Sequence, residues 1–402
     1  MEMYFGSVAR VTLLGVVPVL LLSACRHEPA RSYDSAAAVT VPMSLAGTHA
    51  SIEVQVNGRP ARMLLDTGAD QIAVSPVAAE RLGLATETGL TPGSGAAGSI
   101  AALKTSIDDL AVREFYLRRQ VAYVVPFPQE FQYDGVLGIP FFAAFVTTMD
   151  YQRGLFTFEA THAFETRRDA TSIPIRVENG KLLVSATAGG VSGWYSIDTG
   201  AGNALTFFTP TVERLHLRDA FTPSVTMVTG LSVGGYTHGT LVRLPRVDIG
   251  PFSFEQVVAE LSLDAVGYFA ASQNTGNLGG ELWQRFTVTL DYANGCMYLT
   301  PNDAFNVPFA GPRSGLVPAV VDEVVKVIYV LEGGPAAEAG VHAGDTIVAL
   351  NSVVLAPTID AAQATNTVVQ ALKAEAGTPI VLRLRDASGA EREVGFVLRE
   401  LI

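Results

Sequence analysis

The chain has 402 residues, of which 49% are hydrophobic and 16% are charged, and its formal net charge is −12. This length divides into roughly two to four domains, and the composition excludes a disordered or fibrous protein. The carboxylates are scattered, no basic stretch is interleaved with aromatic residues, and neither paired His residues nor Cys-x-x-Cys occurs, so we expect no nucleic-acid surface, no metal and no other cofactor.

The N-terminal segment has the features of an export signal. An apolar run at residues 11–22, interrupted by a proline, is too short to span a bilayer as a helix. It ends in Leu-Ser-Ala-Cys at 22–25, which resembles the lipobox of bacterial lipoproteins. We therefore expect a signal peptide at 1–24, a lipid on Cys25 and a tether at 25–40. The alternative is an ordinary signal peptide followed by an unmodified cysteine.

The lipoprotein resemblance also implies a location. A lipidated chain is anchored in the cell envelope through its first residue. Arg26 stands where inner-membrane lipoproteins often carry Asp. The resemblance therefore implies anchoring in the outer membrane, facing the periplasm.

An internal repeat organises the middle of the chain. Arg-Met-Leu-Leu-Asp-Thr-Gly-Ala at 62–69 recurs as Trp-Tyr-Ser-Ile-Asp-Thr-Gly-Ala at 194–201. In both copies a helix-like segment follows, and further on a Leu-Gly pair precedes Phe and Asp-Tyr at matching spacing. We infer two homologous lobes, at 41–165 and 170–301.

The sequence of each lobe predicts a mainly β structure. Residues 50–58 alternate apolar and polar side chains and end at Asn-Gly, a pattern typical of a strand and hairpin turn. Short strands at 155–158 and 297–299 close the two lobes. Few helices are expected.

Asp66 and Asp198 are the only acids duplicated inside an identical tetrapeptide, Asp-Thr-Gly-Ala. Two carboxylates that share one proton can work together, one as the base on a bound water and the other, protonated, as the group that polarises a carbonyl. Two copies of one lobe facing each other can supply that geometry. Asp66 and Asp198 are therefore the candidate catalytic pair.

The residues after each Asp support this arrangement. Thr67 and Thr199 can each hydrogen-bond the opposite loop and lock the carboxylates together. Gly68 and Gly200 permit a tight turn and a close approach of the backbone between lobes.

The run Leu-Leu-Asp-Thr-Gly-Ala-Asp at 64–70, with its downstream Leu-Gly, resembles the retropepsin-like aspartic proteases, and the tandem arrangement resembles a pepsin-style fused dimer. The resemblance covers about residues 45–300. It implies a β-barrel lobe on each side of one cleft, and endopeptidase action on peptide or protein substrates of the cell envelope. One chain holds both lobes, so a monomer suffices. The alternative is an inactive lipoprotein that binds peptides or assembles partners.

The resemblance also places flaps between the Asp-Thr-Gly and Leu-Gly elements. The candidates are residues 91–99, with Gly93, Gly95 and Gly98, and residues 229–239, with Tyr236. Ordinary surface turns are the alternative, because glycine clusters are common in β proteins.

The first glycine cluster also matches the dinucleotide fingerprint Gly-x-Gly-x-x-Gly. That pattern binds nucleotides between a strand and a helix. Here Pro92 precedes it, and the second lobe has no such run. We therefore expect no nucleotide binding.

One departure from the family bears on pH dependence. Pepsin-like enzymes carry a hydroxyl directly after the glycine, where it favours the charged carboxylate. This chain has Ala69 and Ala201 there. We expect a less acid-shifted pair and activity nearer neutral pH.

A different pattern follows a linker at 306–314. Gly-Gly-Pro-Ala-Ala-Glu-Ala-Gly at 333–340, then Gly-Asp-Thr-Ile-Val-Ala-Leu-Asn at 344–351, resembles PDZ domains of bacterial periplasmic proteases, over about 313–402. Such α+β domains bind extended peptides by strand addition. The resemblance puts the carboxylate loop at Ser314, Gly315, Leu316 and Val317, and the groove helix at 361–374. Alternatively, this domain only braces the protease.

Overall fold

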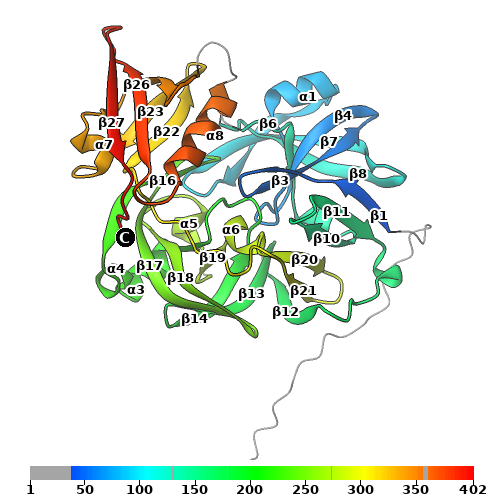
Figure 1. Cartoon of the computed structure of the whole chain (residues 1–402). Coiled ribbons are helices and arrows are strands. Elements are labelled where there is room, and N and C mark those ends of the chain that lie inside the picture. The colour runs from blue at the N-terminus through cyan, green and yellow to red at the C-terminus, as the bar shows by residue number, and fades with distance from the viewer. Residues whose placement is uncertain (1–37, 129–130, 179, 273, 356–360) are drawn as a thin grey trace, which may run out of the picture.

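The computed structural model describes residues 38–128, 131–178, 180–272, 274–355 and 361–402 (Figure 1). The expected signal peptide at 1–24 and Cys25 lie outside the described residues, as does most of the tether at 25–40. Val39 and Thr40 differ from the expectation, because they belong to strand β1 (Val39–Pro42) and pair with a strand of the first lobe. Strands dominate the described chain, which confirms the mainly β class.

The first lobe is a curled sheet. Its strands are β2 (Ser44–Ala46), β3 (His49–Val56), β4 (Arg59–Leu65), β5 (Ile72–Val74), β6 (Thr86–Ser94), β7 (Ser99–Val112), β8 (Phe115–Val124) and β9 (Gly135–Leu137). Their order is β2-β3-β4-β9-β5-β8-β7-β6, and β3 also pairs with β7. This extra pairing closes the sheet into a barrel-like body. Its helices are α1 (Pro76–Leu82) and α2 (Ile139–Phe142).

The second lobe repeats this topology. Its strands are β13 (Lys181–Ala188), β14 (Val191–Ile197), β15 (Leu205–Phe207), β16 (Ser224–Ser232), β17 (Gly235–Ile249), β18 (Phe252–Ser262) and β19 (Gly276–Leu278). Their order is β13-β14-β19-β15-β18-β17-β16, and β13 also pairs with β17. Its helices are α3 (Thr209–Arg214), α4 (Leu217–Ala220), α5 (Tyr268–Ala271) and α6 (Gly280–Trp283).

Both lobes contribute strands to one connecting sheet. The order is β1-β11-β10-β20-β21-β12, and β10 pairs antiparallel with β20. The strands other than β1 are β10 (Val146–Asp150), β11 (Leu155–Glu159), β12 (Thr171–Glu178), β20 (Phe286–Asp291) and β21 (Cys296–Pro301), and the short helix η1 (Thr161–Ala163) lies between β11 and β12. The lobes are therefore joined by backbone hydrogen bonds as well as by side chains.

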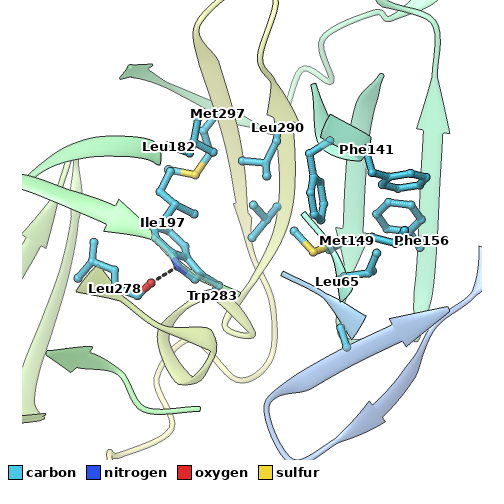
Figure 2. Packing of buried hydrophobic residues seen from close by; sticks show 14 of the residues in the cluster. Leu65, Phe141, Met149, Phe156, Leu182, Ile197, Leu278, Trp283, Leu290 and Met297 are labelled. Carbon is cyan, nitrogen blue, oxygen red and sulfur yellow. Dashed lines mark hydrogen bonds between the residues drawn. The ribbon is translucent and has the colours of Figure 1, made fainter. Parts of the chain in front are cut away.

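A continuous apolar core supports this connection. Figure 2 shows Phe141 and Phe156 of the first lobe on one side of β20 and β21, and Ile197 and Trp283 of the second lobe on the other. The indole Nε1 of Trp283 donates to the Leu278 carbonyl at 2.7 Å. Burial of these large side chains contributes roughly 1.5–3 kcal/mol each. The core holds the ends of β4 and β14, from which the two Asp-Thr-Gly loops leave.

The C-terminal domain is a smaller α+β unit. It contains β22 (Leu316–Val321), β23 (Val324–Val330), α7 (Pro335–Glu338), β24 (Thr346–Leu350), β25 (Val353–Val354), α8 (Ala361–Leu372), β26 (Pro379–Arg385) and β27 (Glu391–Val397). β22 is the edge strand, and α8 packs on β22 and β23 (Figure 1). The domain rests on the second lobe, where the Tyr329 hydroxyl donates to the Thr226 carbonyl of β16 at 3.1 Å.

Within the described ranges, no helix combines the length and apolar character needed to cross a bilayer.

Candidate active site

The two Asp-Thr-Gly loops are positioned by the same strand arrangement. β4 runs parallel to β9, and β14 runs parallel to β19. The Asp66 amide donates to the Leu137 carbonyl at 3.1 Å, and the Asp198 amide donates to the Leu278 carbonyl at 3.0 Å. The repeated Leu-Gly pair is therefore the segment that anchors the start of each loop.

Reciprocal hydrogen bonds of two buried threonines lock the loops together. The Thr67 hydroxyl donates to the Ile197 carbonyl at 2.7 Å and accepts from the Thr199 amide at 3.1 Å. The Thr199 hydroxyl donates to the Leu65 carbonyl at 2.8 Å and accepts from the Thr67 amide at 3.1 Å. Both threonines are fully buried. Each loop therefore depends on the other for its conformation.

The carboxylates are held by their own loops. Asp66 Oδ1 accepts from the amides of Gly68 and Ala69 at 2.8 and 3.1 Å. Asp198 Oδ1 accepts from the amides of Gly200 and Ala201, both at 3.0 Å. Both side chains are oriented by backbone donors alone on this oxygen, as alanines follow the glycines.

Each carboxylate packs against the glycine of the opposite loop. A methyl group on Gly68 would lie 2.4 Å from Asp198 Oδ1, and one on Gly200 would lie 2.3 Å from the carboxyl carbon of Asp66. Real side chains do not approach this closely, so only glycine fits at either position. Asp66 and Asp198 therefore face each other across the lobe boundary.

This environment makes Asp66 a weak acid. Burial raises its pKa to about 7, and the negative charge of Asp198 acts in the same direction. The amide of Gly68, the charge of Lys181 and the amide of Ala69 oppose this shift and are outweighed. A pair of interacting carboxyls in which one holds its proton near neutral pH is suited to acid–base chemistry.

Two basic side chains, not singled out in the sequence, contact the loops from outside. His49 Nε2 donates to the Gly200 carbonyl at 3.0 Å, and Lys181 Nζ donates to the Gly68 carbonyl at 2.5 Å. The two occupy the first positions of the corresponding strands β3 and β13. Burial lowers the pKa of His49, so its ring is neutral at pH 7, whereas Lys181 brings a positive charge.

The second lobe carries a buried polar row that the first lobe lacks. Four polar residues lie in register on the neighbouring strands β14, β19, β15 and β18 of the second lobe. The corresponding residues of the first lobe, on β4, β9, β5 and β8, are apolar except for one tyrosine. The polar row consists of Ser196, Asn277, Thr206 and Glu260, and its counterparts are Leu64, Val136, Ala73 and Tyr123. Sequence reasoning missed this row.

Two members of the polar row connect to the surroundings of the active site. Asn277 Nδ2 donates to Asp198 Oδ2 at 2.8 Å. Glu260 accepts from the Thr229 hydroxyl of β16 at 2.6 Å and from Asn203 Nδ2 at 3.2 Å. Burial raises the pKa of Glu260 to about 7. The row thus links the second Asp-Thr-Gly loop to the second hairpin.

The expected flap segments are hairpin tips. The first hairpin joins β6 to β7 and contains Gly95 and Gly98 in its loop, with Gly93 on β6. The second joins β16 to β17 and turns at 233–234, while Tyr236 lies on β17 with an exposed side chain. The strand before the Gly-x-Gly-x-x-Gly run leads into another strand, which is not the setting of a nucleotide-binding loop.

The backbones of the two hairpin tips approach each other closely. A methyl group on Gly95 would lie 1.5 Å from the Val233 carbonyl oxygen, and one on Gly98 would lie 2.4 Å from the Gly234 carbonyl oxygen. These glycines are therefore required by the contact between the hairpins, in addition to any flexibility that they give.

The first tip also docks on the start of α5. The amide of Tyr268 donates to the Gly95 carbonyl at 2.9 Å, and the amide of Phe269 donates to the Ala96 carbonyl at 3.1 Å. The structure therefore holds the first hairpin in contact with the second lobe.

The expected carboxylate loop of the C-terminal domain lies at the start of its edge strand. Gly315 has a left-handed φ of 69°, and β22 begins at Leu316 and continues through Val317. The Leu316 amide donates to the hydroxyl of Ser314 at 3.1 Å. This donor is therefore already engaged by its own loop. The expected groove helix ends at Leu372, two residues before the position inferred from the sequence.

No group of three or more His, Cys, Asp or Glu side chains that could hold a metal was found in the described part of the chain.

Comparison with known proteins identifies two domains. Residues 52–141 match the family model described as aspartyl protease, and residues 326–386 match one described as a PDZ domain. The chain therefore contains an aspartyl protease domain and a PDZ domain, and the expected resemblances to these two families are confirmed. The first match ends at residue 141, within the first lobe.

The solved structures that match parts of the chain include two aspartic proteases. An aspartic proteinase from Irpex lacteus has 12% identity and a TM-score of 0.45, with 67% of this chain and 99% of that one covered. A retropepsin-like aspartic protease from Rickettsia conorii has 18% identity and a TM-score of 0.24, with 31% of this chain and 90% of that one covered. No curated protein matched the chain in sequence.

Proposed function

We propose that the protein is an aspartic endopeptidase in which Asp66 and Asp198 activate one water. The observation that carries this proposal is the crossed packing of the two carboxylates. Each lies against the glycine of the opposite loop, at the floor of two loops that reciprocal threonine bonds hold rigid. An assembly that only bound peptides would not need two acids facing each other.

The proposed reaction starts from a dyad that carries one proton. The ionised carboxylate takes a proton from the water, whose oxygen bonds to the scissile carbonyl carbon, and the protonated carboxyl gives its proton to the carbonyl oxygen. In the second step the carbon–nitrogen bond breaks. The nitrogen takes the proton gained from the water, and one hydroxyl of the intermediate returns a proton to the other carboxylate, so the dyad regains its starting state.

The pKa of Asp66 sets the upper end of the working pH range. Above about pH 7 Asp66 is ionised, because its pKa is raised to about 7, and it no longer holds a proton for the carbonyl oxygen. We therefore propose activity in the weakly acidic to neutral range. An optimum below about pH 3, under the ordinary pKa of Asp, would contradict this.

The deciding experiment compares peptide hydrolysis by residues 26–402 with that by its Asp66→Asn and Asp198→Asn variants. Each variant keeps the shape of the side chain but cannot exchange the proton, so we expect a loss of about 10²–10⁴-fold. A statine-type inhibitor should block the wild-type chain alone. Equal turnover by all three chains would favour the alternative, an inactive peptide-binding lipoprotein.

We propose that the PDZ domain holds part of the substrate. Its edge strand β22 is the element to which an extended peptide can add, and Tyr329 on the neighbouring strand contacts β16 of the second hairpin. A captured chain would thus lie beside the protease lobes. Peptides with free and amidated C-termini should bind the full chain differently, and equal binding of both, or of neither, would favour a bracing role.

We propose that the protein is lipid-anchored through Cys25 in the cell envelope, on the periplasmic side of the outer membrane, and acts as a monomer on envelope proteins or peptides. The support is the lipobox resemblance of residues 22–25. Mass spectrometry of the N-terminal peptide from membrane fractions should show a diacylated cysteine. A Cys25 recovered without lipid, either as an unmodified thiol or in a disulfide with Cys296, the other cysteine, would contradict lipidation.

A further inference from the structure

Asn277 is the residue of the polar row that touches the active site. It is 1% exposed, and its Nδ2 donates to Asp198 Oδ2 at 2.8 Å. The matched residue of the first lobe is Val136, which pairs in the same register with β4 and β5. The valine side chain has no hydrogen-bond donor. At this repeat-related position, only the second lobe therefore supplies a side-chain donor to its aspartate.

Packing does not explain an asparagine at this position. The Oδ1 atom of Asn277 is buried and has no hydrogen-bond partner among the described residues. A buried acceptor without a partner destabilises a fold. Val136 fills the equivalent position of the first lobe with no such group, so an apolar residue would serve the sheet better. The amide is therefore explained by its contact with Asp198.

We propose that Asn277 is a positioning residue that makes Asp198 the ionised member of the dyad and Asp66 the carrier of the proton. A hydrogen bond donated to a carboxylate stabilises its charged form, and only Asp198 receives one from a side chain of the row. This inference rests on the proposed function. In the hydrolytic step, Asp198 then takes the proton from the water, and Asp66 gives its proton to the carbonyl oxygen.

Among the described residues, three other titratable groups interact electrostatically with the dyad. His49 lies near Asp198, and burial lowers its pKa, so its ring is neutral at pH 7. Tyr292 lies near Asp66 and stays neutral, because burial raises its pKa. Lys181 favours the charged form of Asp66 and thus acts against the proposed assignment, but burial of Asp66 outweighs it. Asn277 is therefore the group whose removal should disturb the assignment most directly.

The test uses the full chain, purified in detergent, and its Asn277→Leu variant, which keeps the side-chain volume. Loss of the hydrogen bond should move the acid limb of the pH profile of kcat/KM upward by about one pH unit, since bonds to charged groups commonly have this effect. Thr206→Val is the matched control, because it changes the same row at a hydroxyl that contacts Glu260 and Asn203. Its acid limb should stay in place.

A second readout separates this inference from the proposed function. Carbon-13 NMR of labelled aspartate carboxyls follows both dyad members with pH, whether or not the protein hydrolyses peptides. Asp66→Asn and Asp198→Asn chains assign the signals. In the wild-type chain the Asp198 signal should titrate first as the pH rises, and in Asn277→Leu the two titrations should converge. A folded Asn277→Leu chain with unchanged titrations would overturn the inference, even if the protein were inactive.

Discussion

The two lobes share every contact that brings the carboxylates together and differ in the groups that set their charge. Both have the same strand order around the loop, the same threonine bonds and the same glycine against the opposite carboxylate. In contrast, the row that is Leu64, Val136, Ala73 and Tyr123 in the first lobe is polar in the second. The repeat therefore builds a symmetric frame, and side chains in register behind it in the second lobe make the two carboxylates unequal.

The largest expected effect comes from the symmetric part of the site. Gly68→Ala and Gly200→Ala each place a methyl group within 2.5 Å of the opposite carboxyl group, which must then move. We expect both variants to lose about a thousand-fold in peptide hydrolysis, because a displacement of about 1 Å at reacting groups is already severe. If one variant kept its activity while the other lost it, the frame would not be symmetric.

The second effect is on stability. The pKa of Asp66 is about 7 in the folded protein and 3.8 in the unfolded chain, so the folded state binds more protons between these values, and its stability falls as pH rises from about 4 to 7. Asp66→Asn removes this loss of stability. The variant should gain on the order of 4 kcal/mol over wild type at pH 8 and little at pH 4. Denaturant unfolding at both pH values measures it, and an equal difference at both would contradict the raised pKa.

The threonine bonds should contribute less, and equally in the two lobes. Thr67→Ala and Thr199→Ala each leave a buried carbonyl and a buried amide without their partner, at a cost of about 1–3 kcal/mol. Thr→Ser at the same positions retains the hydroxyl and serves as the control. Each threonine hydroxyl accepts from the backbone amide of the other threonine, so the two substitutions are coupled. The double variant should therefore lose less stability than the sum of the two single variants. Additive costs would show that the two threonines act independently.

The smallest effect separates the two basic residues. Lys181 lowers the pKa of Asp66 by its charge, so Lys181→Met should move the basic limb of the pH–activity profile upward by less than about one pH unit. His49 is neutral at pH 7 because burial lowers its pKa, and His49→Gln should leave that limb unchanged. A shift of the basic limb in both variants, or in neither, would contradict this difference between Lys181 and His49.

The sequence predicts the arrangement of the two active-site loops better than it predicts the charges and polar contacts around them. The repeated Asp-Thr-Gly-Ala and Leu-Gly segments indicated the loops and their anchors, because both lie in short contiguous runs. Extending the same repeat backward would have paired His49 with Lys181. The polar row could not be found in this way. Asn277 and Glu260 become neighbours of Thr206 only through strand register, which the sequence pattern does not specify.

The glycines of the first hairpin show a similar limit. The number of glycines suggested a flexible flap or a surface turn. Both interpretations consider one hairpin by itself. The structure adds a reason that depends on two hairpins, because Gly95 and Gly98 touch the backbone of residues 233–234. No local pattern reports such a contact.

The docking of the first hairpin on α5 has a consequence for how fast a polypeptide can enter. Two backbone hydrogen bonds, from Tyr268 to Gly95 and from Phe269 to Ala96, fasten the tip. At about 0.5–1.5 kcal/mol each, they favour the fastened state by roughly 1–3 kcal/mol, so between about one molecule in six and one in 150 is unfastened at any moment. For the proposed endopeptidase, a polypeptide that enters past this tip would find it unfastened only in that fraction of molecules, so capture would be slower by the same factor.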